Sequence, residues 1–194
     1  MEKLNGKKIN TAVFISGRGS NLKSLIGFFK KKQSPILISL IISNNASAKG
    51  IIYAKKSKLK HYIISFKNKK IFEKNVLKKL FNNKIDLICL AGFMKILSSD
   101  FIKKFKKPIL NIHPSLLPKY KGLNTHKKVI KNGEKYSGAT VHLVTKTLDS
   151  GKIILQKKVK ITKYETEKTL EKKILKVEHE LYPKAIKKFT ASNF

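Results

Sequence analysis

The sequence predicts an α/β fold of the Rossmann-like type, in which a mainly parallel, twisted sheet carries helices on both faces and continues into an antiparallel C-terminal extension. Three observations predict this class. Up to residue 113, short apolar runs alternate with segments in which apolar residues recur at helical spacing. These runs are apolar almost throughout, as in strands that are buried on both faces. Beyond residue 113, two strand-like runs follow one another with only a turn between them.

The first part of the chain predicts five strands joined by four helices. The strands are short and rich in β-branched residues, at 12–16, 36–43, 62–66, 85–90 and 109–113. The helices carry lysines on their exposed faces, at 22–32, 46–59, 70–82 and 98–106. Strands joined in this way run parallel through right-handed crossovers, so we expect a ligand site at their carboxyl ends.

The second part of the chain begins with a loop that contains proline and glycine and runs to Gly122. Periodicity and turn residues predict its further elements: a helix at 125–131, strands at 139–145 and 153–161, and a helix at 165–189. We expect Pro183 to break the last helix, because proline removes a backbone donor and clashes with the preceding turn.

Length and composition predict one globular domain over residues 1–194. Hydrophobic residues make up 41% of the chain and charged residues 28%, both in the globular range. Cys89, the only cysteine, lies in an apolar run and is expected to be an inert, buried thiol in a reducing compartment. Because no apolar run could span a bilayer and no signal-type cleavage pattern is present, we expect a cytoplasmic protein without a membrane partner.

The formal net charge of +33 suggests a nucleic-acid partner, because clustered cations release counterions from phosphates. Two features argue against a specific one. Arg18 is the only arginine among 44 basic residues, although arginine is better suited to forked recognition of phosphates and bases. The lysines are also spread along the whole chain. We expect weak, salt-sensitive binding to polyanions, and a basic nucleic-acid-binding module stays the alternative from another class.

The segment Ser16-Gly17-Arg18-Gly19-Ser20-Asn21 lies between the first predicted strand and helix, where backbone amides can hold a phosphate. A dinucleotide site would need an acidic residue after the second strand, where the chain has Ser43-Asn44-Asn45. The spacing of a nucleoside-triphosphate loop is also missing. A single phosphomonoester fits best. In the alternative, Gly17 and Gly19 only turn the chain and Ser20 caps the helix.

Two polar residues, Asn111 and His113, interrupt an apolar strand directly before Pro114. Since they are two positions apart, their side chains project from the same face of the strand. An amide donor beside an imidazole suits a reaction that develops negative charge on oxygen and moves a proton. The alternative is a satisfied core histidine beside a turn asparagine.

Asp149 lies in the turn-rich segment between the last two predicted strands and is either an ordinary turn aspartate or a partner of His113. In the second case, its carboxylate would raise the pKa of the imidazole and keep His113 protonated more often near neutral pH. His113 would then be a proton donor.

Four blocks in this order resemble the glycinamide ribonucleotide formyltransferase family, the folate-dependent enzymes of purine synthesis. The blocks are Gly17-Arg18-Gly19-Ser20-Asn21-Leu22, Ala91-Gly92-Phe93-Met94-Lys95-Ile96-Leu97, Asn111-Ile112-His113-Pro114-Ser115-Leu116-Leu117-Pro118 and Leu148-Asp149-Ser150-Gly151. The third block is shared by formyl-transferring enzymes in general, whereas the first indicates the glycinamide ribonucleotide branch. The resemblance covers nearly the whole chain.

The resemblance implies a set of site residues in four groups. They are the catalytic Asn111, His113 and Asp149; the substrate-phosphate loop Gly19, Ser20 and Asn21; the ribose contact Glu178; and the folate-binding Met94, Lys95, Ile96 and Leu97 with Asn111. Lys69 falls where the family often has an arginine that faces the folate glutamate tail. A solvated helix glutamate is the alternative for Glu178. The implied division is a phosphate-binding half, 1–110, and a catalytic and folate-binding half, 111–194.

The chain departs from the family pattern at four positions, namely Lys95, Lys121, Asn124 and Ser150, where arginine, proline, histidine and glycine are common. Lys95 keeps its charge but loses bidentate geometry, and Ser150 could shift the loop that carries Asp149. His126 and His142 are also near-site candidates, for which we expect structural roles.

The resemblance implies transfer of the formyl group from 10-formyltetrahydrofolate to the glycine amine of glycinamide ribonucleotide, in de novo purine (IMP) biosynthesis, without a metal. It also implies small-molecule partners and a monomer or weak homodimer. The alternatives are a 10-formyltetrahydrofolate hydrolase, which we expect to carry an extra regulatory domain, and an initiator-tRNA formyltransferase, which we expect to carry an extra RNA-binding domain.

Overall fold

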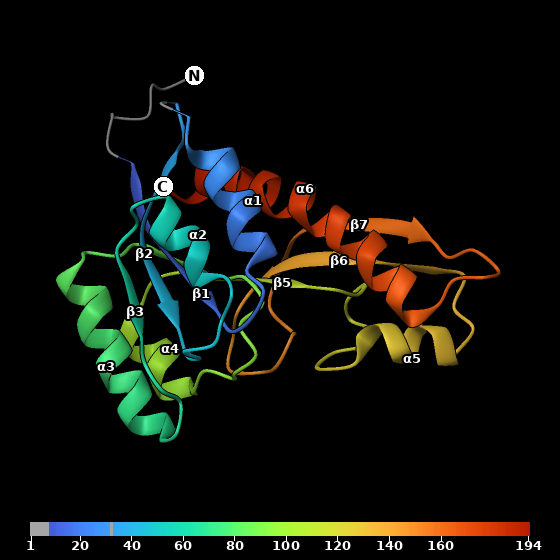
Figure 1. The fold of residues 1–194 in the computed structure, drawn as a ribbon, viewed down its shortest axis with the longest axis horizontal. Helices are drawn as coiled ribbons and strands as arrows, with labels where there is room; N and C mark the ends of the chain where they lie inside the picture. The colour runs from blue at the N-terminus through green and yellow to red at the C-terminus, as the bar shows by residue number, and fades with distance from the viewer. Residues whose placement is uncertain (1–7, 32) are drawn as a thin grey trace.

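The computed structural model describes residues 8–31 and 33–194, and its centre is a seven-stranded sheet of order β3-β2-β1-β4-β5-β6-β7 (Figure 1). The strands are β1 Ile9–Ile15, β2 Ile36–Ser43, β3 His61–Ile63, β4 Leu87–Leu90, β5 Ile109–His113, β6 Tyr136–Leu143 and β7 Ile153–Lys160. The first five strands pair in parallel, whereas β6 and β7 are antiparallel to their neighbours. The predicted α/β class, with its antiparallel extension, is confirmed.

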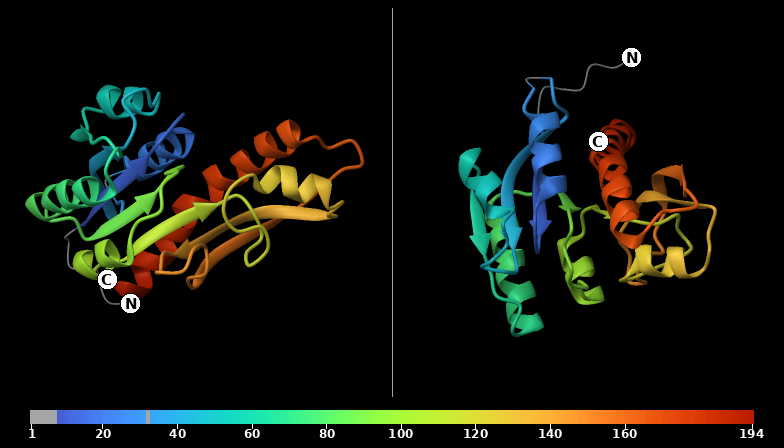
Figure 2. Two further views of the ribbon diagram at one scale, coloured as in Figure 1. Left: turned by 90° about the horizontal axis from the view of Figure 1, so that it is seen from below. Right: turned by 45° about the vertical axis from the view of Figure 1, so that its right-hand side comes forward.

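In the described part of the chain, six helices pack around this sheet. They are α1 Ser20–Phe29, α2 Ile51–Lys56, α3 Lys69–Asn82, α4 Ser99–Phe105, α5 Thr125–Lys131 and α6 Glu167–Asn193. One core cluster joins the sheet to α1, α2 and α6, and a second joins it to α3 and α4. Figure 2 shows α6 on the side of the molecule away from α3. Along β1, Val13 belongs to the first cluster and Phe14 to the second, which is why this strand is apolar throughout.

Helix α6 does not break at Pro183, contrary to the sequence prediction. It runs from Glu167 to Asn193 and contains Pro183 as a buried residue. Tyr182, Ala185 and neighbouring apolar residues of this stretch are buried in the core. Burial of this face outweighs the backbone hydrogen bond that proline removes. Within the described part of the chain, no helix is long and apolar enough to cross a membrane.

Some predicted boundaries are also wrong. The second predicted helix, 46–59, shrinks to α2 because Asn45 closes a turn in its place, with its side-chain oxygen accepting from the amide of Ser47 at 2.9 Å. β3 is only three residues long, and β6 begins at Tyr136, before the predicted start at 139. Residue 32, the predicted end of the first helix, lies outside the described residues.

Candidate active site

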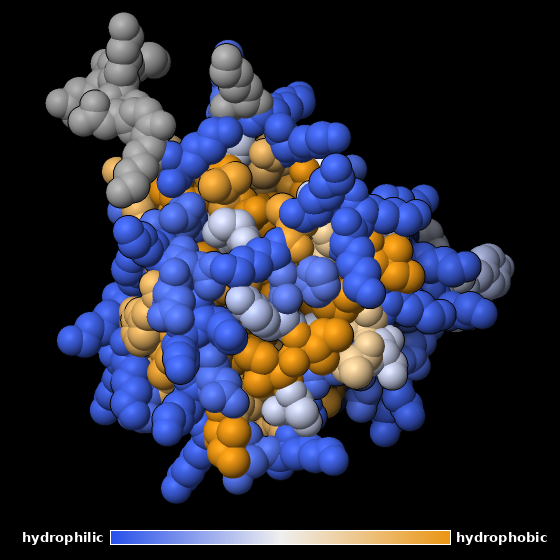
Figure 3. All heavy atoms as spheres, turned by 60° about the vertical axis from the view of Figure 1, so that its left-hand side comes forward, coloured by the Kyte–Doolittle hydropathy of each residue, from blue (hydrophilic) through white to orange (hydrophobic). Residues whose placement is uncertain are grey.

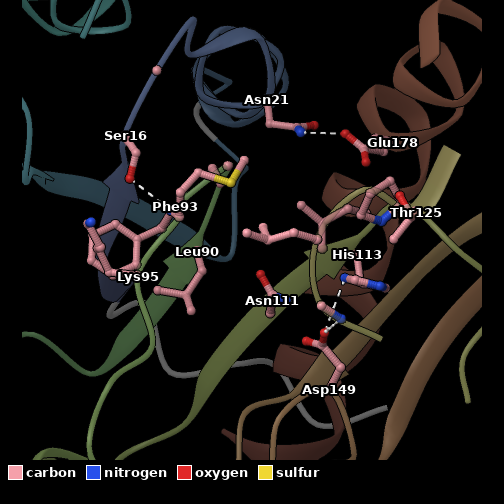
Figure 4. Close-up of a pocket in the computed structure, with 18 of the residues that line it drawn as sticks. Ser16, Asn21, Leu90, Phe93, Lys95, Asn111, His113, Thr125, Asp149 and Glu178 are labelled. Atoms are coloured by element: carbon pink, nitrogen blue, oxygen red, sulfur yellow. Dashed lines mark hydrogen bonds and ion pairs between the residues drawn. The ribbon is translucent and has the colours of Figure 1, made fainter. Parts of the chain in front are cut away.

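A cavity of about 710 Å³ lies at the carboxyl ends of the central parallel strands (Figure 4). Its walls come from distant parts of the chain. They are formed by the loop after β1, the segment after β4, the end of β5 with the loop that follows, the β6–β7 connection, and one side of α6. This is the position expected for a ligand in an open, parallel sheet.

The glycine-rich loop forms one end of this cavity and leads into α1. Gly19 is the residue before the helix and has a positive φ of 72°, and no side chain caps the helix there. The alternative interpretation, in which Ser20 caps the helix, is therefore wrong. A Cβ on Gly19 would lie 2.4 Å from Cα of Gly50, so the loop packs directly against the start of α2. The free amides and the positive end of the helix remain available to an anion.

Glu178 faces this loop from α6 and is buried, with only 7% of its surface exposed. Its Oε2 accepts a hydrogen bond of 2.7 Å from Nδ2 of Asn21 (Figure 4). Burial raises the pKa of Glu178 to about 7, although the hydrogen bond from Asn21 opposes the change. Glu178 is thus not a solvated helix glutamate. Oδ1 of Asn21 is buried and has no hydrogen-bond partner among the described residues, so it too can receive a donor from a ligand.

Asn111 and His113 lie at the carboxyl end of β5, and both line the cavity. Nε2 of His113 lies 2.8 Å from the carbonyl oxygen of Tyr120, to which it donates. Nδ2 of Asn111 lies 3.2 Å from Nε2 of His142, its partner in the antiparallel register of β5 and β6. Nδ1 of His142 lies 2.8 Å from the carbonyl oxygen of Leu143 and therefore carries a proton. In the singly protonated ring, Nε2 of His142 accepts from Asn111 and orients its amide.

Asp149 reaches the same place from the β6–β7 connection, where its φ is positive at 46°. Its Oδ2 accepts a hydrogen bond of 2.9 Å from the amide of Gly122 and lies 3.4 Å from Nδ1 of His113. Its Oδ1 lies 3.5 Å from Nε2 of His142. The structure thus brings the three sequence-predicted residues, Asn111, His113 and Asp149, together (Figure 4).

Asp149 raises the pKa of His113 as predicted, but it is not the largest influence on this pKa. Burial lowers the pKa of His113 below its ordinary value of 6.5, and this outweighs the Tyr120 carbonyl and the charge of Asp149, which raise it. The prediction that His113 is kept protonated near neutral pH is therefore wrong. For Asp149, burial raises the pKa, but the contact with His142, the hydrogen bond from Gly122 and the histidine charges outweigh it, so its pKa is lowered. The free site pairs a carboxylate with a neutral ring.

The segment after β4 forms a further wall of the cavity, beside the loop that follows β1. Met94 and Ile96 are exposed there, whereas Leu97 is buried. The amide of Met94 donates to Oγ of Ser16 at 2.8 Å, and Nζ of Lys95 lies 5.2 Å from the centre of the Phe66 ring. These exposed apolar side chains suit a flat aromatic ligand.

Lys69 is the one sequence-predicted binding residue that does not line the cavity. It is exposed and begins α3. Two departures from the family pattern contact each other: Nζ of Lys121 donates to Oγ of Ser150 at 2.6 Å. This contact links the loop before Gly122 to the loop that carries Asp149. Asn124, a third departure, has a positive φ of 58° and precedes α5 at the cavity wall.

Four polar residues that line the cavity were given no functional role by the sequence analysis, namely Arg18, His126, His142 and Glu171. His142 was expected to be structural, yet it contacts both Asn111 and Asp149. Its position on β6 directly opposite Asn111 was the available signal, but the register of two strands cannot be read from either strand alone. Nδ1 of His126 is buried and has no hydrogen-bond partner within the described residues.

Comparison with known proteins identifies the protein family of this chain. Residues 9–186 match the formyl transferase family. The chain belongs to this family, because the match covers most of its length.

Individual proteins of known sequence or structure show to which members of the family the chain is similar. A phosphoribosylglycinamide formyltransferase of Haemophilus influenzae is 41% identical over 187 residues, which are 95% of this chain and 87% of the relative. The crystal structure of phosphoribosylglycinamide formyltransferase from Anaplasma phagocytophilum is 39% identical, with a TM-score of 0.91 over 96% of this chain and 88% of the other. A trifunctional purine biosynthetic protein, adenosine-3, of Bos taurus is 40% identical over 183 residues. The match covers 93% of this chain but only 18% of that relative.

Proposed function

We propose that this protein transfers the formyl group of 10-formyltetrahydrofolate to the glycine amine of glycinamide ribonucleotide in purine biosynthesis. The observation that carries the proposal is the convergence of Asn111, His113 and Asp149 in a cavity that is also lined by a phosphate-type loop and by exposed apolar side chains. The relatives named above support the same reaction.

The reaction needs a group that stabilises an oxyanion and a group that moves a proton. The substrate amine attacks the formyl carbon, and the electron pair of the carbonyl bond moves to its oxygen. The amide of Asn111 donates to this oxygen. His113 starts neutral because it is buried, so it accepts the proton of the attacking amine through water and becomes charged. The carboxylate of Asp149 stabilises that charge.

Collapse of the intermediate returns the proton. The bond between the formyl carbon and the folate nitrogen breaks, and His113 supplies this nitrogen with the proton that it took from the amine. The products are the substrate with its amine converted to a formamide, and tetrahydrofolate, so atoms and charges balance. Asp149 keeps the ring in place during both steps, because the Gly122 amide fixes its carboxylate.

The binding roles follow the two kinds of cavity wall, the phosphate-type loop and the apolar segment after β4. Gly19, Ser20 and Asn21 hold the substrate phosphate, and Glu178 holds the ribose hydroxyls. On the folate side, the proposed contacts are Met94, Lys95, Ile96, Leu97 and Asn111. The co-substrate is 10-formyltetrahydrofolate. Lys69 remains the proposed contact of the glutamate tail, at the start of α3.

The proposed acceptor is tested by offering labelled 10-formyltetrahydrofolate with glycinamide ribonucleotide, with water alone, or with initiator tRNA. We expect the label in formylglycinamide ribonucleotide only. Release of formate at the same rate with and without the ribonucleotide would indicate a hydrolase, and label on tRNA would indicate the RNA-directed enzyme. Either result would overturn the proposal.

The lysines are spread along the whole chain, which disfavours the basic-module alternative. On the face shown in Figure 3, hydrophilic side chains lie on all sides of a central area of exposed apolar side chains. A polyanion groove would instead gather cations along one track.

A further inference from the structure

The only arginine of the chain forms an ion pair across the mouth of the cavity. The guanidinium Nη2 of Arg18, in the loop between β1 and α1, contacts Oε1 of Glu171 on α6. Both residues line the cavity, and 73% and 40% of their side chains are exposed. Such an exposed pair contributes little to stability, so its exchange for another partner is cheap in free energy.

This ion pair lies at the glycine-rich loop, which is the part of the cavity that suits a phosphate. Arg18 directly precedes Gly19, where the free amides of α1 begin. Asn21, two residues further on, is buried and has an unpartnered Oδ1. The exposed guanidinium thus marks a place for the phosphate, and the buried amide oxygen marks an adjoining place for a donor such as a ribose hydroxyl.

Glu171 conflicts with an anion at this place. Its carboxylate occupies the guanidinium that a phosphate would use, and it adds negative charge beside the loop. Glu167 and Glu178 line the same cavity from the same helix, so the α6 wall is acidic. A phosphate dianion has more charge than a single carboxylate and accepts two parallel hydrogen bonds from a guanidinium, so it can displace Glu171 from Arg18.

We propose that Arg18 exchanges its Glu171 partner for the substrate phosphate, and that Glu171 is a built-in competitor that makes the site selective for a phosphorylated ribose. A neutral riboside cannot displace Glu171, so the ion pair between Arg18 and Glu171 would stay intact and the riboside would gain no contact with the guanidinium. The inference rests on the proposed function, because it assigns the ligand of the same loop. In the opposite case, the pair is a permanent strap that holds α6 against the loop.

Binding of ribose 5-phosphate, measured by calorimetry, separates the two cases in a double-mutant cycle. We expect Arg18→Ala to weaken binding about tenfold, because a charge-assisted bidentate contact is lost. Glu171→Gln should tighten binding about threefold, because the competitor is weakened by roughly the strength of an exposed ion pair. In the double variant, the Glu171 substitution should tighten binding less, because it then relieves only the repulsion between its charge and the phosphate. Arg18→Lys should recover part of the affinity.

Glu180→Gln is the matched control. Glu180 lies on the same helix, pairs with Lys157 at 2.9 Å and does not line the cavity, and its substitution changes the net charge by the same amount. It should leave the affinity unchanged. A Glu171→Gln variant that binds ribose 5-phosphate equally or more weakly would overturn the proposal, as would an Arg18→Ala variant of unchanged affinity or a wild-type protein that does not bind ribose 5-phosphate.

This experiment needs no turnover, so its result is independent of the proposed reaction. If the cycle behaves as expected but no formyl group reaches glycinamide ribonucleotide, the ion-pair exchange holds and the proposed function fails. If formyl transfer occurs but the cycle is flat, only the exchange fails.

Discussion

Nδ1 of His113, at the end of β5, lies 3.4 Å from Oδ2 of Asp149, in the connection between β6 and β7. Both side chains are buried, and the other ring nitrogen of His113 already donates to the Tyr120 carbonyl. The neutral ring is thus held through one nitrogen, and its other nitrogen faces a carboxylate that can stabilise a second proton. This arrangement explains how a histidine that starts neutral can gain and lose charge during one reaction.

Asn111→Ala should lower kcat by about two to three orders of magnitude, because it removes the donor to the developing oxyanion. The fold should be intact, since Asn111 is only half-buried and lies at the end of its strand. Steady-state kinetics and a thermal melt check the two parts. Turnover within a factor of a few of wild type would exclude the proposed role of this amide.

His142→Ala should lower kcat by about 10- to 100-fold, because it frees both the Asn111 amide and one oxygen of Asp149 to move. His142 acts by positioning these groups, so its effect depends on Asn111. Relative to Asn111→Ala alone, the double variant should therefore be slower by a smaller factor than the one that His142→Ala causes in the wild type. Fully multiplicative losses would show that the two residues act independently.

Glu178→Gln should make stability less dependent on pH. The folded-state pKa of Glu178 is about 7, raised by burial from 4.5. Between these values the folded protein holds a proton that the unfolded chain has released, so the stability contributed by the protonated group is lost as pH rises. The variant has no proton to lose at this position. Above about pH 7, its free energy of unfolding should exceed that of wild type by up to about 3 kcal/mol. Its amide can still receive the hydrogen bond of Asn21.

Thermal unfolding of both proteins at about pH 4.5 and about pH 8 measures this difference. The relative gain of Glu178→Gln should appear only at the higher pH. A gain of the same size at both pH values would mean that Glu178 does not titrate in the folded protein.

Gly50→Ala should weaken binding of the ribonucleotide about tenfold, because a shifted loop loses part of its charge-assisted contacts to the phosphate. The added Cβ would lie 2.9 Å from Cα of Gly19 and push on the phosphate loop. Gly27→Ala is the matched control. Gly27 is an exposed residue of α1 with no atom within 4 Å of the added Cβ, and this substitution should leave KM unchanged while stabilising the helix slightly. Equal KM values for the two variants would contradict the proposed packing of the loop.

Local patterns predicted the α/β class and the Asn111–His113 pair, because strand periodicity and a polar interruption are visible in a single segment. They did not predict how far helix α6 continues past Pro183, since this depends on burial against the sheet. The contacts of Arg18, Glu171 and His142 were not predicted, for a related reason. Their partners come from other elements, and only the packing of α6 and the register of β6 bring them together.

The most direct test of the proposed mechanism compares wild type and Asp149→Asn in the pH dependence of kcat/KM for formyl transfer to glycinamide ribonucleotide. Loss of the carboxylate removes a group that raises the pKa of His113, so the acidic limb, already below the ordinary histidine value of 6.5, should move to still lower pH. The rate on the plateau should fall by about three orders of magnitude or more. A variant with the wild-type rate and an unmoved acidic limb would contradict the pairing of His113 with Asp149 in catalysis.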